Sequence, residues 1–258
     1  MKSKLILSVL FLGALFSLHA QDANAIVRAS RNRIKADTVS TRSRMVIQAK
    51  DGTTTERLID NYSKDGPNGA RSIIIFLQPA SIAGSRFLTM ENKNGPDDRW
   101  IFMPNLGKVR RMAASEGSGS FMGTDFSYDD IASTSRNADL DTHTLLKEEN
   151  LSATPCYVIQ SIPKDSAYQY SKIIQWIAKD TSIVMKLELY DKRNTLVKTV
   201  EMSGIKTIQD KLTVTITKMT THAAGTSTTI TNEIVKYNDP VPEGVFTTAY
   251  LETGKVSR

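Results

Sequence analysis

The sequence predicts a mainly β fold of the α+β class, built on an antiparallel sheet of about eleven strands. Short runs alternate apolar and polar residues with a period of two, which is typical of strands that bury one face. Turn residues separate these runs, and Asp51-Gly52 and Asp65-Gly66 are hairpin signals. Strands and helices do not alternate in the repeating order that a parallel sheet requires. A Rossmann fold and a P-loop fold are therefore not expected.

The first twenty residues have the pattern of a secretory signal peptide. Lys2 and Lys4 precede an apolar run at 5–18 that is short for a bilayer span, and small residues follow it. Cleavage is predicted after Ala20 or after Ala25, and a retained anchor helix is the alternative. Because no cysteine lies near either position, a lipid-modified N-terminus is not expected. The remaining residues, 21–258, are numerous enough to form a single domain.

A short helix is predicted at the start of this domain, over 22–36. Asp22 is suited to cap it, and Ala25, Ile26 and Ala29 form a narrow apolar stripe. Beyond this segment the apolar period changes from 3.6 to 2. The first group of strand candidates consists of residues 42–52, 53–66, 70–79, 84–95 and 97–112.

The glycine-rich stretch after these strands does not match a nucleotide-binding loop. Gly117, Gly119 and Gly123 have the spacing G-x-G-x-x-x-G, and Thr124-Asp125 follows where a Walker loop needs lysine and then serine or threonine. The stretch is instead interpreted as a flexible segment that crosses over the sheet. Its aromatic residues either form the rim of a pocket or cap the core. A short helix with acidic residues in its first turn is predicted to follow, over 126–133.

The second half of the chain repeats the strand pattern and ends in a short helix that begins near Pro242. One hairpin connection is predicted between Tyr190 and Thr195. The strand candidates of this half are residues 154–162, 170–180, 182–191, 196–208, 211–222 and 226–237.

Composition favours a binding protein over an enzyme. The formal charge of +6 is mild, and an exported chain without a recognition motif is not expected to bind nucleic acid. His143 and His222 lack the spacing of zinc ligands, so neither a metal site nor a cofactor is predicted. Cys156 is expected to be a buried thiol, and a dyad with His143 is a remote alternative. Adjacent carboxylates at Glu148-Glu149 point apart and make a poor acid–base pair.

The middle of the chain resembles a known family. The motifs W-x-F-x-P at 100–104, K-x-R-R at 108–111 and S-F-x-G-x-D-F-S-Y-x-D at 120–130 are similar to the outer-membrane lipoprotein-sorting proteins. That LolA-like family belongs to the wider LolA/LolB lipoprotein-carrier superfamily. The resemblance extends over about 42–250.

This resemblance implies a curved antiparallel sheet that forms an incomplete barrel, with short helices covering its concave side. The expected function is a periplasmic carrier, or chaperone, that holds the acyl chains of lipoproteins or free lipids on their way to the outer membrane. The alternative is an accessory substrate-binding protein of an exporter of the RND/MMPL type. Expected partners are acyl chains, an inner-membrane RND/MMPL transporter, an outer-membrane acceptor and, transiently, a membrane. A monomer is expected.

The residues of the predicted lipid cavity are apolar side chains on the strands and on the crossing segment. Several strands are apolar on both faces, as expected where a sheet is covered on one side and lines a cavity on the other. The alternative is that these side chains fill an ordinary core. The predicted set is Ile74, Phe76, Phe87, Trp100, Phe102, Met103, Phe121, Met122, Phe126, Ile174, Trp176, Met185 and Leu187.

Charged residues on both sides of the glycines are predicted to gate this cavity. Arg110 and Arg111 are placed to pair with Asp125, Asp129 or Asp130 and hold the segment over the sheet, or to meet an anionic headgroup at the rim. A solvated strand end is the simpler explanation for the two arginines.

Overall fold

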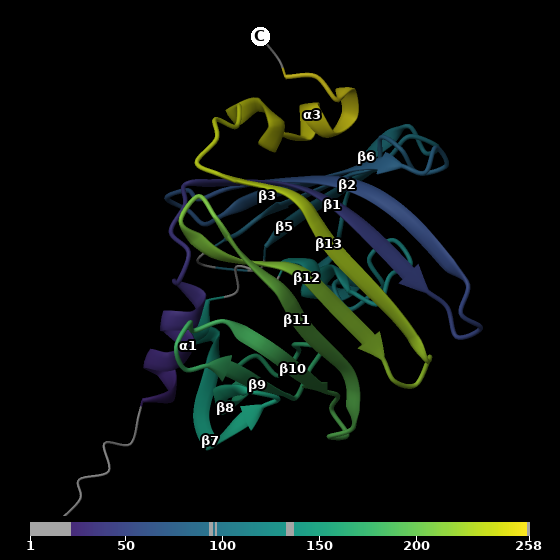
Figure 1. The fold of residues 1–258 in the computed structure, drawn as a ribbon. Coiled ribbons are helices and arrows are strands. Elements are labelled where there is room, and N and C mark those ends of the chain that lie inside the picture. The colour runs from purple at the N-terminus through teal and green to yellow at the C-terminus, as the bar shows by residue number, and fades with distance from the viewer. Residues whose placement is uncertain (1–21, 93–94, 96, 133–136, 257–258) are drawn as a thin grey trace, which may run out of the picture.

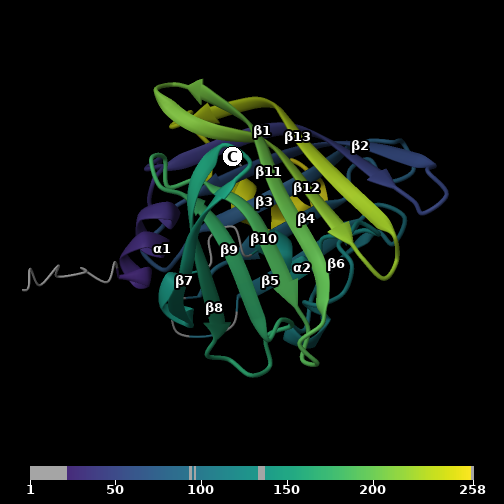
Figure 2. The same cartoon turned by 60° about the horizontal axis from the view of Figure 1, so that its bottom comes forward.

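The fold is a single bent antiparallel sheet with a few short helices (Figures 1 and 2). The computed structural model describes residues 22–92, 95, 97–132 and 137–256. Thirteen strands form the sheet in the order β6-β5-β4-β3-β2-β1-β13-β12-β11-β10-β9-β8-β7. This confirms the predicted mainly β antiparallel fold. The predicted signal peptide, residues 1–20, lies outside the described residues.

The strands have the following bounds. They are β1 (Thr38–Gln48), β2 (Thr54–Lys64), β3 (Arg71–Gln78), β4 (Arg86–Met90), β5 (Asp98–Met103), β6 (Lys108–Arg111), β7 (Asp141–Leu151), β8 (Thr154–Pro163), β9 (Lys172–Ala178), β10 (Val184–Tyr190), β11 (Leu196–Ile208), β12 (Lys211–Thr221) and β13 (Thr226–Tyr237).

Two of these strands account for the difference from the eleven candidates. The run at 97–112 divides into β5 and β6, because a turn ending in Gly107, with φ of 63°, reverses the chain. Strand β7 is mostly polar on both sides, with exposed Lys147 and Glu148 in its middle, so it lacks the alternation that marks a strand.

The predicted helices are present. Helix α1 (Ala23–Arg31) is capped by Asp22, whose side chain accepts a hydrogen bond of 2.9 Å from the backbone of Asn24. Helix α2 (Tyr128–Ala132) follows the glycine-rich stretch, and η4 (Glu243–Phe246) and α3 (Thr248–Thr253) end the fold. The 3-10 turns η1 (Ala114–Glu116) and η3 (Ala138–Leu140) lie between β6 and β7.

The strand order forces the chain across the sheet once. Strands β1 to β6 lead outward to one edge, whereas β7 to β13 begin at the opposite edge and return to pair with β1. Because β6 and β7 are consecutive in the chain, the connection between them passes from one edge to the other, and its described residues are 112–132 and 137–140. We call this stretch the crossing segment, and its presence confirms the predicted path of the glycine-rich region over the sheet.

The two faces of the sheet have separate cores. On the face that bends around the crossing segment, here the concave face, Ile74 and Phe76 of β3 pack with Phe121. On the opposite, convex face, Ile73 of the same strand packs with Phe246. Strand β3 is therefore apolar on both sides because both sides are covered.

The helices divide between the faces. Figure 1 shows α3 outside the sheet, where it contacts β4, β5 and β6 while η4 contacts β3. Helix α2 packs Tyr128 and Ile131 against the core of the concave face. At the other end of the sheet, α1 packs Ile26 and Val27 against Ile159 of β8 and Ile177 of β9. The concave face is thus covered by α1, α2 and the crossing segment, while η4 and α3 protect the convex face.

Phe246 tests the contribution of this convex core. The residue is 1% exposed and packs under the guanidinium of Arg71, which lies 5.3 Å from its ring centroid. We expect Phe246→Ala to lower the free energy of unfolding by about 3–5 kcal/mol, because it removes a ring from a packed site. Urea denaturation measures the change. Leu106→Ala, at a turn residue that is 54% exposed, serves as control and is expected to cost less than about 0.5 kcal/mol; equal losses in the two variants would contradict the assignment.

Candidate functional site

The crossing segment places an aromatic cluster at the centre of the concave face. Phe121 is fully buried, and its ring lies 5.7 Å from that of Phe76, 5.4 Å from that of Phe87 and 5.4 Å from that of Tyr128. We call these four residues the aromatic cluster. Phe76 and Phe87 are only 1% and 2% exposed, so side chains occupy the space between sheet and segment.

A tight turn delivers Phe121 to this position. Met122 and Gly123 both have positive φ, 52° and 78°, so the chain reverses directly after the ring. The backbone N–H of Phe121 donates to the carbonyl of Phe126 at 2.7 Å, and the Thr124 hydroxyl donates to the carbonyl of Phe121 at 2.8 Å. The turn therefore satisfies its own backbone groups in a buried place.

Asp125 anchors the turn to β13. Its carboxylate accepts hydrogen bonds from the hydroxyl of Thr226 at 2.5 Å and from that of Thr228 at 2.7 Å. Its backbone N–H donates to the same Thr228 oxygen at 3.0 Å. Asp125 is 7% exposed, so these bonds form away from bulk water, where they are most needed.

Asp130 anchors α2 to the strands on the far side of the bend. Its carboxylate accepts from the Lys198 ammonium at 3.0 Å, the Tyr170 hydroxyl at 2.9 Å and the Gln169 amide at 3.1 Å. Burial, together with the neighbouring Asp130 charge, raises the pKa of the Tyr170 phenol far above its ordinary value. Tyr170 therefore stays a neutral hydrogen-bond donor.

Asp129 makes the third anchor. It accepts a hydrogen bond of 2.5 Å from the guanidinium of Arg99 on β5. Gly117 lies against this carboxylate, since a Cβ added there would meet Asp129 Oδ1 at 2.3 Å. Three carboxylates of one short stretch thus tie the crossing segment to three different parts of the sheet.

The predicted pairing of the gating residues is wrong in its partners. Arg110 pairs with Glu116 at 2.6 Å, and Arg111 pairs with Asp98 on the adjacent strand. Both arginines lie on the short edge strand β6, whereas the three aspartates are held by residues from β5, β11, β13 and the turn before β9. No feature of the sequence marks Thr228, Lys198 or Tyr170 as partners.

The thirteen predicted cavity residues divide between the two faces. On the concave face, in or against the clusters around Phe121 and Phe126, lie Ile74, Phe76, Phe87, Met103, Phe121, Met122, Phe126 and Leu187. The convex face holds the other members of the set, Trp100, Phe102, Ile174, Trp176 and Met185.

Strand geometry explains this division. Trp100 and Phe102 alternate with Ile101, which packs in the concave core. The period of two along a strand predicts that Met185 shares a face with Leu187. A bulge between Val184 and Lys186 moves Met185 to the opposite side. The convex residues are therefore not in contact with the aromatic cluster.

The histidine and the cysteine that sequence reasoning singled out also lie on different faces. His143 is buried, with ring nitrogens 2.7 Å from the Ser161 hydroxyl and 2.9 Å from the carbonyl of Ala138. Cys156 is fully buried in the convex cluster with Trp176, which confirms the predicted buried thiol, and burial raises its pKa. The two residues do not form a dyad.

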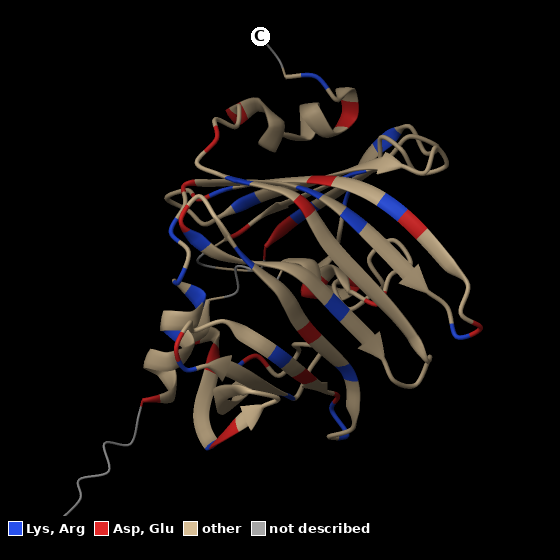
Figure 3. Ribbon diagram, viewed as in Figure 1, with Lys and Arg blue, Asp and Glu red and all other residues tan. Residues whose placement is uncertain are grey.

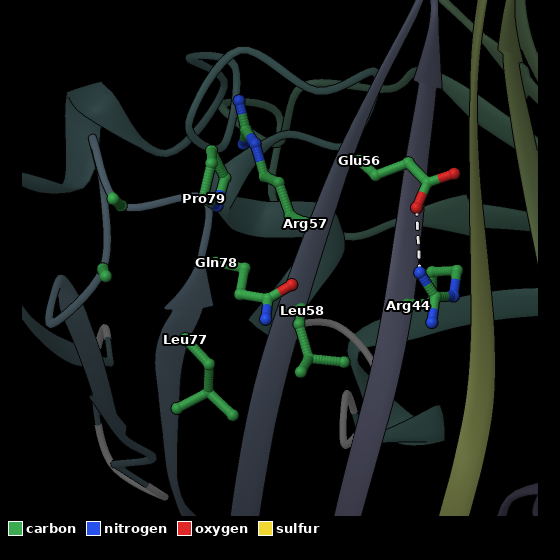
Figure 4. A pocket seen from close by; sticks show the side chains of 9 residues that line it. Arg44, Glu56, Arg57, Leu58, Leu77, Gln78 and Pro79 are labelled. Carbon is green, nitrogen blue, oxygen red and sulfur yellow. Dashed lines mark hydrogen bonds and ion pairs between the residues drawn. The ribbon is translucent and has the colours of Figure 1, made fainter.

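Arg57 of β2 stands out on the concave face because it lacks a carboxylate partner among the described residues. Its Nε and Nη1 atoms are buried without a hydrogen bond, and burial lowers the pKa of the guanidinium. It also borders a pocket of ≈ 450 Å³ at this end of β2 and β3 (Figure 4), which Leu77, Pro79 and, from the convex side, the ion pair of Arg44 with Glu56 line as well. Sequence reasoning missed Arg57.

Elsewhere the charges of the described residues are mixed. Figure 3 shows Lys and Arg interspersed with Asp and Glu along the strands. The described helices are all too short or too polar to cross a membrane.

Comparison with known proteins assigns the chain to a family. A family model described as an uncharacterized protein matches residues 68–253, more than half of the chain. The chain belongs to this family. No curated protein matches the chain.

Solved structures share the fold of this chain. The chain is similar to a candidate outer membrane lipoprotein-sorting protein domain from Vibrio parahaemolyticus, with a TM-score of 0.84 and 26% identity over 90% of this chain and 99% of that one. It is equally similar to a DUF1329 family protein from Desulfovibrio piger, with a TM-score of 0.84 and 27% identity over 90% and 98% of the two chains. A LolA superfamily protein from Nitrosomonas europaea has a TM-score of 0.70 and 22% identity over 88% and 98%. The LolA-superfamily fold that the central motifs predicted is confirmed.

The Asp125 anchor can be tested by its removal. We expect Asp125→Ala to speed hydrogen–deuterium exchange in residues 117–131 and to lower the free energy of unfolding by about 1–3 kcal/mol, because the hydroxyls of buried Thr228 and partly buried Thr226 lose their acceptor. Asp51→Ala, in the exposed turn between β1 and β2, is the control. Exchange of residues 117–131 that is unchanged in Asp125→Ala would show that the aromatic cluster alone holds the turn.

Tyr170 leads to a prediction about pH. Its pKa is raised in the folded state, so its contribution to stability is complete below the ordinary phenol pKa of about 10 and is lost as pH rises above it. Wild type is expected to be more stable than Tyr170→Phe at pH 8. The difference should shrink by about 1.4 kcal/mol per pH unit above pH 10. Denaturant unfolding at a series of pH values measures it, and a constant difference would refute the assignment.

Proposed function

We propose that this protein is a periplasmic carrier that holds lipid acyl chains between the concave face and the crossing segment. The position of Phe121 supports the proposal most strongly. Its ring occupies the middle of the apolar concave face, but it belongs to a turn of the crossing segment that only ring contacts and hydrogen bonds hold against the sheet. A hydrocarbon chain that displaces this turn meets Ile74, Phe76 and Phe87. The similarity to a candidate lipoprotein-sorting domain supports the same function.

Magnitudes are compatible with reversible binding. Withdrawing Phe121 from its site costs about 1.5–3 kcal/mol of apolar burial, and each anchoring hydrogen bond to a carboxylate contributes about 1.5–3 kcal/mol. A chain of about fourteen methylenes gains on the order of 10 kcal/mol when it leaves water. Acyl burial is therefore large enough to displace the turn. Because the bilayer offers a similar free energy, the chain can also be released to a membrane or an acceptor.

The chemistry required is binding alone. Carriage needs no nucleophile, metal or cofactor, only an apolar surface that can be uncovered and covered again. The cargo comprises the acyl chains of lipoproteins or of free lipids, and the partners are a donor at the inner membrane, such as an RND/MMPL transporter, and an acceptor at the outer membrane.

Export by the signal peptide places the carrier in the periplasm. Of the two cleavage positions, the one after Ala20 leaves α1 intact, whereas cleavage after Ala25 would remove the capping Asp22 and the first turn of the helix. The mature chain, residues 21–258, acts as a single domain.

Phe121→Ala tests the role of the turn. We expect this variant to bind a fluorescent C14 fatty-acid probe about tenfold to a hundredfold more tightly than wild type, because the probe no longer competes with the ring. Phe246→Ala, the same change on the convex face, is expected to leave the affinity unchanged when both variants are assayed in their folded range.

Mass spectrometry of lipids extracted from protein purified out of its own periplasm gives an independent test. Acyl lipids bound to wild type, and their transfer to acceptor vesicles, are the expected results. Retention without transfer would favour an accessory binding protein of an exporter. Failure to bind either a native lipid or the probe would refute the carrier function.

A further inference from the structure

The unpaired guanidinium of Arg57 lies beside the part of the crossing segment that covers the aromatic cluster. The guanidinium carbon is 5.9 Å from the centroid of the Phe76 ring. A Cβ built on Gly123 would lie 3.9 Å from Arg57 Nη2, so the turn that carries Phe121 also covers this arginine. One movement of residues 121–123 would uncover both an apolar surface and a cation.

Neighbouring charges on the concave face are already neutralised. Arg99 pairs with Asp129 and Lys198 pairs with Asp130. Glu56 precedes Arg57 in β2, but its side chain points to the convex face, where Arg44 binds it at 2.8 Å. Figure 4 shows the Arg57 side chain running alongside Pro79, away from that ion pair.

Nε and Nη1 of Arg57 are buried without an acceptor, which is unfavourable for folding. The planar fork of donors on this side chain suits the oxygens of a phosphate or a carboxylate. The combination of an unused fork and an aromatic cluster under one cover matches a ligand that has an anionic head and an apolar tail.

We propose that Arg57 binds the anionic oxygens of an amphiphile whose alkyl chain takes the place of Phe121. The inference rests on the proposed carrier function and narrows its cargo to lipids with a phosphate or carboxylate group. The head then supplies the acceptor that Nε and Nη1 lack in the closed state.

Calorimetric titration with three probes tests the inference. Dodecyl phosphate has an anionic head and the chain, dodecyl maltoside has the same chain on an uncharged head, and inorganic phosphate has the anion without a chain. Wild type is expected to bind dodecyl phosphate at least about tenfold more tightly than dodecyl maltoside. Arg57→Gln should weaken the binding of dodecyl phosphate by about tenfold to a hundredfold and leave that of dodecyl maltoside unchanged.

Two further variants complete the design. Arg57→Lys keeps the charge but not the fork, and an intermediate affinity is expected. Arg193→Gln, in the exposed turn between β10 and β11, makes the same change in net charge and should behave as wild type. Thermal unfolding of each variant confirms that only folded protein is compared.

The outcomes separate the two proposals. Equal affinity of wild type for the two amphiphiles, or an unchanged preference in Arg57→Gln, would overturn the role of Arg57 while the carrier function stands. Inorganic phosphate that binds as tightly as dodecyl phosphate would overturn the amphiphile as ligand. Failure of both amphiphiles to bind wild type would overturn the carrier function together with this inference.

Discussion

The structure depends on one topological constraint, which is that β6 and β7 follow each other in the chain but lie at opposite edges of a thirteen-stranded sheet. The connection must cross a whole face, and it crosses the concave one. A backbone placed there loses contact with water, so its polar groups need partners within the protein. The turn at Phe121 supplies one through the Phe121–Phe126 hydrogen bond, and Thr228 of the sheet accepts another from the backbone N–H of Asp125. Lys198 and Arg99 bind the side-chain carboxylates of Asp130 and Asp129.

The same constraint makes the interior of this fold different from an ordinary core. Its central apolar group, Phe121, belongs to a connection and not to a strand, so it can leave without breaking the ladder of the sheet. What holds it are contacts between rings and hydrogen bonds to carboxylates, each of a few kcal/mol, whereas the strands are held by long antiparallel pairings such as β1 with β13. The connection and the strands are therefore held by separate sets of contacts. Arg57 lies where the two meet, a cation on β2 covered by the turn at Gly123.

Much of the fold was predictable because it is local. The apolar, β-branched run at 70–79 and the Asp-Gly turns specify strands and hairpins, and Asp22 specifies the start of α1. The candidate site was predictable only in part. Phe121 and Phe126 were identified from their glycine-rich context. Trp100 and Phe102 were predicted to line the same cavity, but they lie on the face of the sheet opposite the aromatic cluster. A strand with apolar residues on both faces does not reveal which face is concave, and the bulge at Met185 leaves no mark in the sequence.

The sequence by itself determined most of the secondary structure, the mainly β class and the family resemblance, since these follow from short-range patterns and motifs. Only the tertiary structure decided which carboxylate meets which donor. Asp125 and Thr228 are separated by 103 residues, and Asp130 and Lys198 by 68. Pairs so distant are brought together by the bend of the sheet and the path of one connection. Neither the bend nor the path is encoded in the neighbourhood of a single residue. For that reason Arg110 and Arg111, although they are close to the glycines in sequence, are not the partners of these carboxylates.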